Sequence, residues 1–88
     1  MEIIRSDRKI NKPYIYLFFN KYDVLDGYYR CKHGIVIIQH FDIIGKYHTY
    51  LEFVYQGRIY DKVIKGPMYT EIGLARKAGE FVKEVINT

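Results

Sequence analysis

The sequence predicts an α+β domain, an antiparallel sheet of three to five strands with a C-terminal helix packed on one face. Two adjacent runs, 47–57 and 58–66, alternate apolar and polar residues and meet at a glycine, as the strands of a hairpin do. The segment 70–86 then repeats its apolar residues at helical spacing. Because 88 residues leave room for one core only, we expect residues 1–88 to form a single domain.

A basic N-terminal arm, 1–12, is expected ahead of a mainly β region, 13–66. The arm carries Arg5, Arg8 and Lys9, which would add affinity for an acidic partner. Its isoleucines equally suit an edge strand, and a solvated tail is the third interpretation.

Segment 13–27 fits two kinds of structure. Five of its apolar residues fall at the spacing of a helix face: Ile15, Phe18, Phe19, Tyr22 and Leu25. Yet residues 14–19 include four aromatic side chains, and rings lose freedom in a helix. A strand is therefore favoured over a helix.

The middle of the chain predicts a second hairpin. Residues 28–32 would pair with 35–41 through a tight turn at His33-Gly34, unless the whole span is one strand kinked at Gly34. The apolar run 35–38 is typical of a central strand that is covered on both faces. The next turn is expected within 42–46.

Two registers are open to the last hairpin. A three-residue loop, 56–58, places Glu52 opposite Lys62, whereas a two-residue loop places Glu52 opposite Asp61. Like charges directly opposite each other are unfavourable, so the longer loop is preferred. In that register Tyr50 shares its face with Tyr60 and Lys62.

The final helix, 70–87, is expected to begin at Thr70, a favoured N-cap residue, with Glu71 in its first turn. Its buried face would consist of Leu74, Ala78, Phe81, Val82 and Val85. Gly73 and Gly79 each cost about 1 kcal/mol in a helix relative to alanine. They therefore indicate a close approach of the helix backbone to the sheet or to another chain.

Composition favours an intracellular protein with an acidic partner. The net charge is +4, and no uncharged run approaches the roughly 20 residues of a membrane span. The N-terminus lacks the apolar core of a signal peptide, and the single cysteine excludes an internal disulfide. We expect a cytoplasmic protein with no membrane partner, and its small size makes a homodimer an option.

Candidate metal and catalytic residues are few. Four residues have the chemistry of zinc ligands: Cys31, His33, His40 and His48. Their spacing matches no established ligand pair, so neither a metal nor a cofactor is predicted. His40 and Asp42 would share one side of a strand and suit an acid–base pair. Because a metal-dependent nuclease needs several neighbouring carboxylates, no catalytic residue is assigned and enzyme activity is not expected.

An aromatic and basic surface is the stronger candidate. The expected phosphate contacts are Arg58, Lys62 and Lys65. Tyr50 and Tyr60 would stack on bases or enter a groove, although packing in the core is the alternative role for such rings. A second mixed cluster of tyrosines and cations lies in 28–32.

The stretch from residue 47 to the end resembles a known DNA-binding domain, and the residues that carry the resemblance are 53–85, FVYQGRIYDKVIKGPMYTEIGLARKAGEFVKEV. That domain is the three-stranded-sheet-plus-helix domain at the N-terminus of phage and transposon tyrosine integrases. The resemblance implies that the sheet docks in the major groove of DNA through Tyr50, Arg58, Tyr60 and Lys62. This helix, however, opens with Thr70-Glu71-Ile72-Gly73 instead of a basic cluster. The chain also resembles, more weakly because of the same departure, the helix–three strands–helix double-stranded RNA-binding domain, a resemblance that requires 13–27 to be helical.

The expected function is therefore nucleic-acid binding, with DNA preferred, by a small protein of a phage, virus or mobile element. The alternative is a small phage or viral inhibitor that binds a host protein such as a defence nuclease, since tyrosine-rich surfaces suit protein contacts. A small nuclease is the third interpretation.

Overall fold

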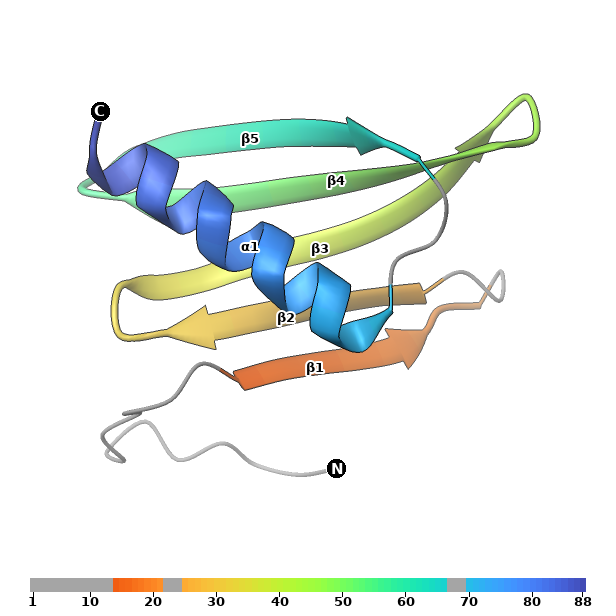
Figure 1. The fold of residues 1–88 in the computed structure, drawn as a ribbon, viewed down its shortest axis with the longest axis horizontal. Helices are drawn as coiled ribbons and strands as arrows, with labels where there is room; N and C mark the ends of the chain where they lie inside the picture. The colour runs from red at the N-terminus through yellow and green to blue at the C-terminus, as the bar shows by residue number, and fades with distance from the viewer. Residues whose placement is uncertain (1–13, 22–24, 67–69) are drawn as a thin grey trace.

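The described residues form five strands and one helix (Figure 1). The structure, a computed structural model, describes residues 14–21, 25–66 and 70–88. Its elements are β1 (Tyr14–Phe19), β2 (Leu25–Cys31), β3 (Gly34–Ile43), β4 (Lys46–Tyr55), β5 (Arg58–Lys65) and α1 (Glu71–Ile86). The predicted α+β fold class is confirmed, with five strands in the sheet. The predicted arm, 1–12, lies outside the described residues.

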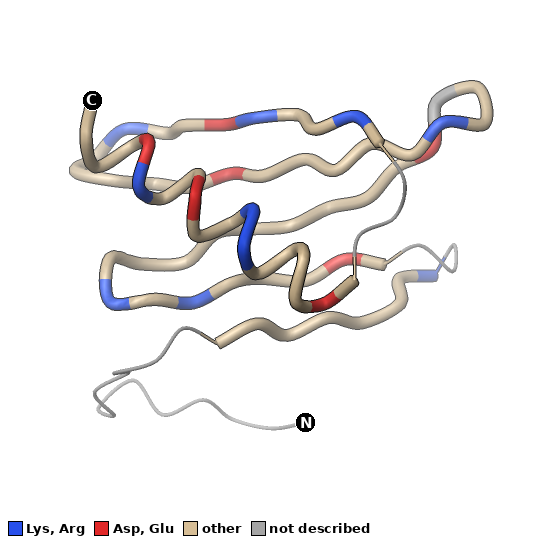
Figure 2. The backbone as a smooth tube through the Cα atoms, in the orientation of Figure 1, with Lys and Arg blue, Asp and Glu red and all other residues tan. Residues whose placement is uncertain are grey.

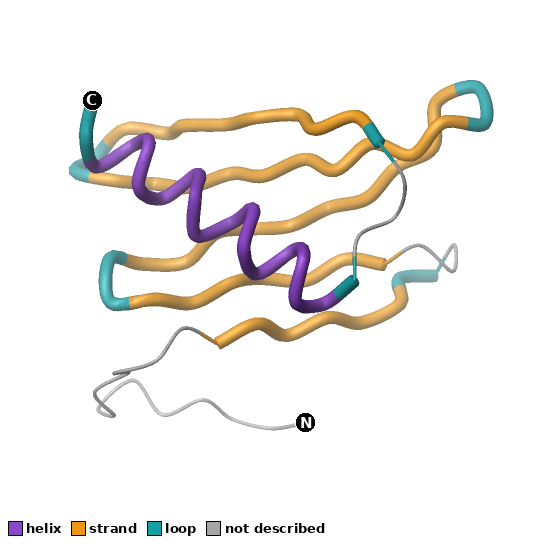
Figure 3. The backbone as a smooth tube through the Cα atoms, viewed as in Figure 1, coloured by secondary structure: helices purple, strands orange, loops and turns teal. Residues whose placement is uncertain are grey.

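The strands form an antiparallel meander in which the order in the sheet is the order in the sequence. α1 crosses one face of this sheet diagonally (Figure 3). We call the side under α1 the helix face and the opposite side the open face. Successive residues of a strand alternate between these two faces, so the pairing register decides what each face carries.

Segment 14–19 is a strand, as favoured over a helix. β1 pairs with β2, and Tyr16 lies opposite Tyr28. The strand conformation places the aliphatic side chains on one face and three of the four aromatic side chains on the other. Ile15 and Leu17 pack against the core on the helix face, while Tyr14, Tyr16 and Phe18 lie on the open face.

The second hairpin consists of two strands, which excludes one strand kinked at Gly34. Lys32 and His33 form its turn, one residue earlier than expected. The run 35–38 is covered on one face only. Val36 and Ile38 are fully buried beneath α1, whereas Ile35 and Ile37 remain more than 40% exposed on the open face.

The β4–β5 hairpin differs from the sequence prediction in its register. Gln56 and Gly57 alone form the loop, and Glu52 lies opposite Asp61. Both loop residues have positive φ, 51° and 77°, as in the hairpin turns whose twist matches that of the strands. This preference outweighs the repulsion of two carboxylates, roughly 0.2–1 kcal/mol across a strand pair. The predicted three-residue loop is wrong, so the side chains of β5 face opposite sides from those expected.

The core lies between α1 and the helix face. The five buried residues of α1 are those predicted: Leu74, Ala78, Phe81, Val82 and Val85. They pack against Val36 and Ile38 of β3 and against Leu51 and Phe53 of β4, all four fully buried. Thr70 caps the helix as predicted, since its Oγ1 accepts a hydrogen bond of 3.1 Å from the Gly73 backbone N–H.

Two glycines allow close approach of neighbouring elements. A Cβ at Gly79 of α1 would lie 3.2 Å from the Tyr29 hydroxyl, which confirms that this helix glycine faces the sheet closely. A Cβ at Gly27 of β2 would collide with the Tyr16 carbonyl oxygen and lie 2.7 Å from the Leu17 Cδ2 atom. Gly27 therefore lets β1 lie tightly against β2.

Candidate functional site

The predicted nucleic-acid-binding residues divide between the two faces of the sheet. Tyr50 and Lys65 lie on the open face, whereas Arg58, Tyr60 and Lys62 lie on the helix face. The shared face predicted for Tyr50, Tyr60 and Lys62 is therefore wrong, because the two-residue loop shifts β5 by one residue. The remaining predicted contacts, Arg5, Arg8 and Lys9, lie outside the described residues.

Lys62 is engaged within the chain. Its Nζ lies 3.0 and 3.2 Å from the two carboxylate oxygens of Glu84 in α1. The other cations of the described residues are spread over strands, turns and helix, with acidic residues between them (Figure 2). A polyanion binds best where several cations lie along one surface. The described residues present no such continuous positive face.

The open face instead is mainly apolar and aromatic. Its exposed apolar residues are Tyr14, Tyr16, Phe18, Ile35, Ile37, Val54, Ile59 and Val63. They come from β1, β3, β4 and β5, and Tyr28 of β2, which is half-buried, lies between them, so the surface extends across the sheet. Monomeric proteins rarely expose an apolar surface that spans a whole face, so such a surface marks an interaction site.

Aromatic rings gather at the β1 side of the open face. The ring centroids of Tyr16 and Tyr28, a cross-strand pair, lie 5.5 Å apart, and those of Tyr16 and Phe18 lie 5.8 Å apart. Both pairs are tilted by 36°. Rings at these separations support one another, and the phenol groups keep their hydroxyls available for hydrogen bonds.

Two carboxylates lie together at the β5 side of the same face. Glu52 and Asp61 are directly opposite each other, and the Tyr50 hydroxyl donates a 2.6 Å hydrogen bond to the Glu52 Oε2 atom. This hydrogen bond, with smaller contributions from desolvation and from both negative charges, raises the pKa of Tyr50 to about 12. Neither carboxylate forms an ion pair with any residue in the described ranges. The pair is an acceptor site that invites a donor or a cation.

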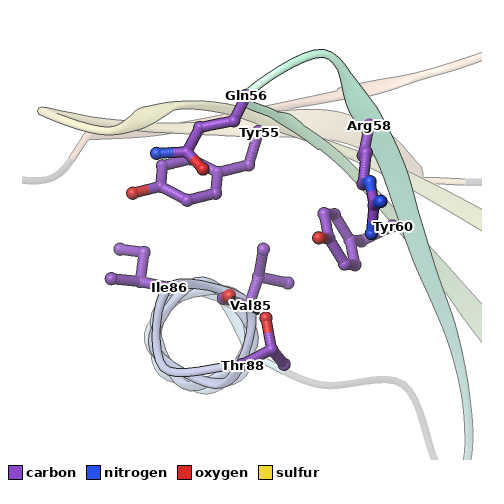
Figure 4. Close-up of a pocket in the computed structure, with 7 residues that line it drawn as sticks. All are labelled: Tyr55, Gln56, Arg58, Tyr60, Val85, Ile86 and Thr88. Carbon is purple, nitrogen blue, oxygen red and sulfur yellow. Dashed lines mark hydrogen bonds between the residues drawn. The ribbon is translucent and has the colours of Figure 1, made fainter.

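A pocket of about 610 Å³ lies on the helix face, between the β4–β5 hairpin and the end of α1 (Figure 4). The rings of Tyr55 and Tyr60 stand on either side of it, and Arg58 and Gln56 lie at its rim. Val85 and its neighbour in α1 form the apolar floor. Arg58 and Tyr60, both predicted contacts, thus meet here rather than on the open face.

His40 and His48 lie on opposite faces of the sheet. His40 is buried on the helix face, where its Nδ1 atom hydrogen-bonds the Leu25 carbonyl oxygen. His48 lies on the open face, where its ring stacks on that of Phe41 with the ring centroids 5.4 Å apart. Across the described part of the chain, no three His, Cys, Asp or Glu side chains gather as metal ligands would. Because the sheet lies between their side chains, His40 and His48 cannot contact the same ligand.

Sequence reasoning missed the open face as a surface of its own. The apolar run 35–38 predicts a strand covered on both faces, and charge repulsion disfavours the pairing of Glu52 with Asp61; the structure differs on both points. The signal that reveals this surface is the two-residue register, because it aligns Ile37, Glu52 and Asp61 across three neighbouring strands. Turn geometry, more than charge, was the informative feature.

Within the described ranges, no helix has the length and apolar character needed to cross a bilayer. The chain matches no family model, no curated protein and no solved structure. The geometry described above leaves two candidate sites, the open face and the pocket beside Tyr55 and Tyr60.

Proposed function

We propose that this chain is a non-catalytic protein-binding module and that the open face is its interface. The observation that supports this most is the apolar surface that extends across the sheet from β1 to β5, with an acidic pair at one side and aromatic rings at the other. Interfaces combine an apolar centre with a few polar groups that fix orientation. A small inhibitor of a host protein would belong to this class.

Charge argues against phosphate binding on this face. Its acidic residues are Asp26, Glu52 and Asp61, and its cations, Arg30, Lys46 and Lys65, lie at a distance from the Glu52–Asp61 pair along or across the strands. A nucleic-acid backbone laid across the sheet would meet Glu52 and Asp61 near its path. Like-charge contacts across an interface cost several kcal/mol, on the order of a thousandfold in affinity. A protein surface with apolar side chains and hydroxyl or basic donors fits better.

Site-specific photo-crosslinking in cells tests this proposal. A photoreactive amino acid replaces Ile37 on the open face or, as a matched control, Ile72 on the outer side of α1. Ile72 is 74% exposed, against 41% for Ile37, so the control is the more accessible position. We expect a discrete cross-linked protein species from position 37 and none from position 72. Equal cross-linking at both positions, or none at position 37, would refute the proposal.

Single-stranded nucleic acid is the second candidate ligand, and the pocket is the observation that favours it. Tyr55 and Tyr60 are diagonal cross-strand neighbours, whose Cα atoms lie roughly 7–8 Å apart. Two ring contacts of about 3.5–4.0 Å each fill that spacing, so one planar base fits between them. Arg58 lies beside the opening and would contact a phosphate. Phe53 stacks on Tyr55 at 5.8 Å and holds that ring in place.

The salt dependence of oligonucleotide binding tests this second candidate. Arg58→Gln should weaken binding and reduce the slope of log affinity against log salt by about 0.7, the value for one phosphate contact in a single strand. The control is Arg76→Gln, which removes an exposed cation from α1 and leaves the pocket intact. Equal losses in both variants would mean that only overall charge matters.

A further inference from the structure

We infer that a second copy of this chain covers the open face, and that the two sheets pack face to face about a twofold axis parallel to β3. This inference rests on the proposed protein-binding function, because it names the partner of that same surface. It follows from the order of residues across the sheet, from the sequence of β3 and from the size of the face.

The open face is ordered in three rows of cross-strand neighbours. From β1 to β5, the middle row is Tyr16, Tyr28, Ile37, Glu52 and Asp61. The rows on either side are Phe18, Asp26, Gln39, Tyr50 and Val63, and Tyr14, Arg30, Ile35, Val54 and Ile59. The middle row thus carries hydroxyl donors at one end, carboxylate acceptors at the other and an isoleucine between them.

A twofold axis parallel to the strands matches these two ends. It reverses the strand order between the copies, so β1 of one copy faces β5 of the other. Tyr16 then meets Asp61 of the second copy, Tyr28 meets Glu52 of the second copy, and Ile37 packs on its own symmetry mate. The phenol hydroxyls would donate hydrogen bonds to the carboxylates, which makes the middle row complementary to itself.

The other way of stacking two such sheets is electrostatically unfavourable. An axis perpendicular to the strands keeps the strand order, so each strand lies over its own copy. Glu52 would then face Glu52 of the second copy, and Asp61 would face Asp61, in an interface that excludes water. Four carboxylates without cations would be desolvated together, and this excludes the arrangement.

The ends of the flanking rows agree with the parallel axis. Phe18 would pack on Val63 of the second copy, and Tyr14 on Ile59, so both contacts join apolar side chains. Arg30 would lie one row away from Glu52 of the second copy, within reach of its long side chain. Face-packed sheets keep their strands within about 30° of each other, which preserves these neighbours near the axis.

The sequence of β3 and the size of the face also fit a second copy. A continuous apolar run such as Ile35–Ile38 is typical of a strand covered on both faces, and α1 covers only one. Each strand residue occupies roughly 3.3 × 4.8 Å of the sheet, so strands of 6 to 10 residues present about 650 Å². Two copies would bury about 1,300 Å², within the range of specific interfaces.

Sedimentation equilibrium of the full chain tests the association. We expect a dimer for the unchanged chain, and a dissociation constant raised at least about 100-fold by Ile37→Glu, which places a carboxylate at the axis. Ile72→Glu, the same substitution on the outer side of α1, should leave the dimer unchanged. If Ile37→Glu fails to fold by circular dichroism, Ile59→Glu takes its place, since Ile59 is 68% exposed.

Cysteine pairing tests the direction of the axis. Cys31→Ser first removes the chain's single cysteine. Tyr28→Cys and Glu52→Cys, carried on differently sized copies, should form a mixed disulfide under mild oxidation. Glu52→Cys alone should not pair with itself. Self-pairing of Glu52→Cys without the mixed species would overturn the parallel axis.

Failure of this inference can be told apart from failure of the proposed function. A chain that stays monomeric at millimolar concentration, yet cross-links to a different protein from position 37, overturns the second copy and retains protein binding. A monomer without any cross-link from position 37 overturns both. A dimer that survives Ile37→Glu and Ile59→Glu places its interface elsewhere and also refutes the inference.

Discussion

Ile44 and Gln56 each occupy the first position of a two-residue hairpin loop, with φ of 53° and 51°. For residues other than glycine this left-handed conformation costs roughly 1–2 kcal/mol. Ile44 is the more strained of the two, because its branched Cβ crowds the backbone and its side chain is 95% exposed. Burial of the Ile44 side chain therefore contributes almost no stabilising free energy to offset the strain.

Ile44→Asn should therefore increase the free energy of unfolding by about 1 kcal/mol, since asparagine adopts the left-handed conformation readily before a glycine. Urea denaturation monitored by circular dichroism measures the change. Ile72→Asn is the matched control, because Ile72 lies exposed in a right-handed helix. The control should lose a few tenths of a kcal/mol from lower helix propensity. A loss of stability in Ile44→Asn would contradict this account of the turn.

Tyr50 offers a second test at the residue scale. Its pKa of about 12 is attributed first to its hydrogen bond with Glu52. Glu52→Gln removes the negative acceptor, so the pKa of Tyr50 should fall toward the ordinary value of 10. Ring-carbon NMR shifts of assigned tyrosines, followed against pH, give this value directly. An unchanged pKa in the variant would mean that Glu52 is not the cause.

At the scale of elements, the fit between α1 and the sheet depends on Gly79 and Tyr29. Alanine at position 79 would gain about 1 kcal/mol of helix propensity. Its Cβ, however, would sit 3.2 Å from the Tyr29 hydroxyl, closer than ordinary van der Waals contact. The helix propensity and the steric contact therefore oppose each other.

A double-mutant cycle separates these two effects. Gly79→Ala alone should change the free energy of unfolding by less than the propensity gain. In the Tyr29→Phe background, which lacks the hydroxyl, the same substitution should stabilise by about 1 kcal/mol. Thermal and urea unfolding of the four proteins give the coupling energy. Equal effects in both backgrounds would show that the hydroxyl does not limit the approach of α1.

The helix and the first strand could be predicted from the sequence, whereas the register of the last hairpin could not. Strong local signals, the helical face of 70–86, the Thr70 cap and the aromatic strand 14–19, were sufficient to predict those elements correctly. The register of β4 and β5 was not predictable from charge, because Gln56-Gly57 forms a favoured tight turn and repulsion between Glu52 and Asp61 is weaker than that preference.

At the scale of the whole molecule, this single register decides which surface the protein presents. A shift of one residue moves every side chain of β5 to the other face. For this reason Tyr50 does not share a face with Tyr60 and Lys62 as predicted, and Glu52 and Asp61 form an acidic pair on the open face instead. The site could not be deduced from residue types alone, since the same residues build a basic or an acidic face according to the turn.

Alkaline pH should destabilise the whole fold. Tyr50 holds its proton to about pH 12 in the folded chain, and burial together with Cys31 raises the pKa of Tyr29. The unfolded chain releases these protons near the ordinary value of 10, so it binds fewer protons between pH 10 and 12. The free energy of unfolding should therefore fall as pH rises through this window. Urea denaturation across the window measures the fall, which Tyr50→Phe should make shallower.

The meander has a further consequence for how the chain reaches this state. Every strand pairs only with its neighbours in sequence, and the connections of β2 to β3, β3 to β4 and β4 to β5 are two-residue turns. Contact order among the strands is therefore low, and hairpins of this kind form in microseconds. α1 is the element that joins distant parts of the chain, because it lies over strands on both sides of β3 (Figure 1). Rapid zipping of successive hairpins, followed by docking of the helix, is the folding route that this architecture favours.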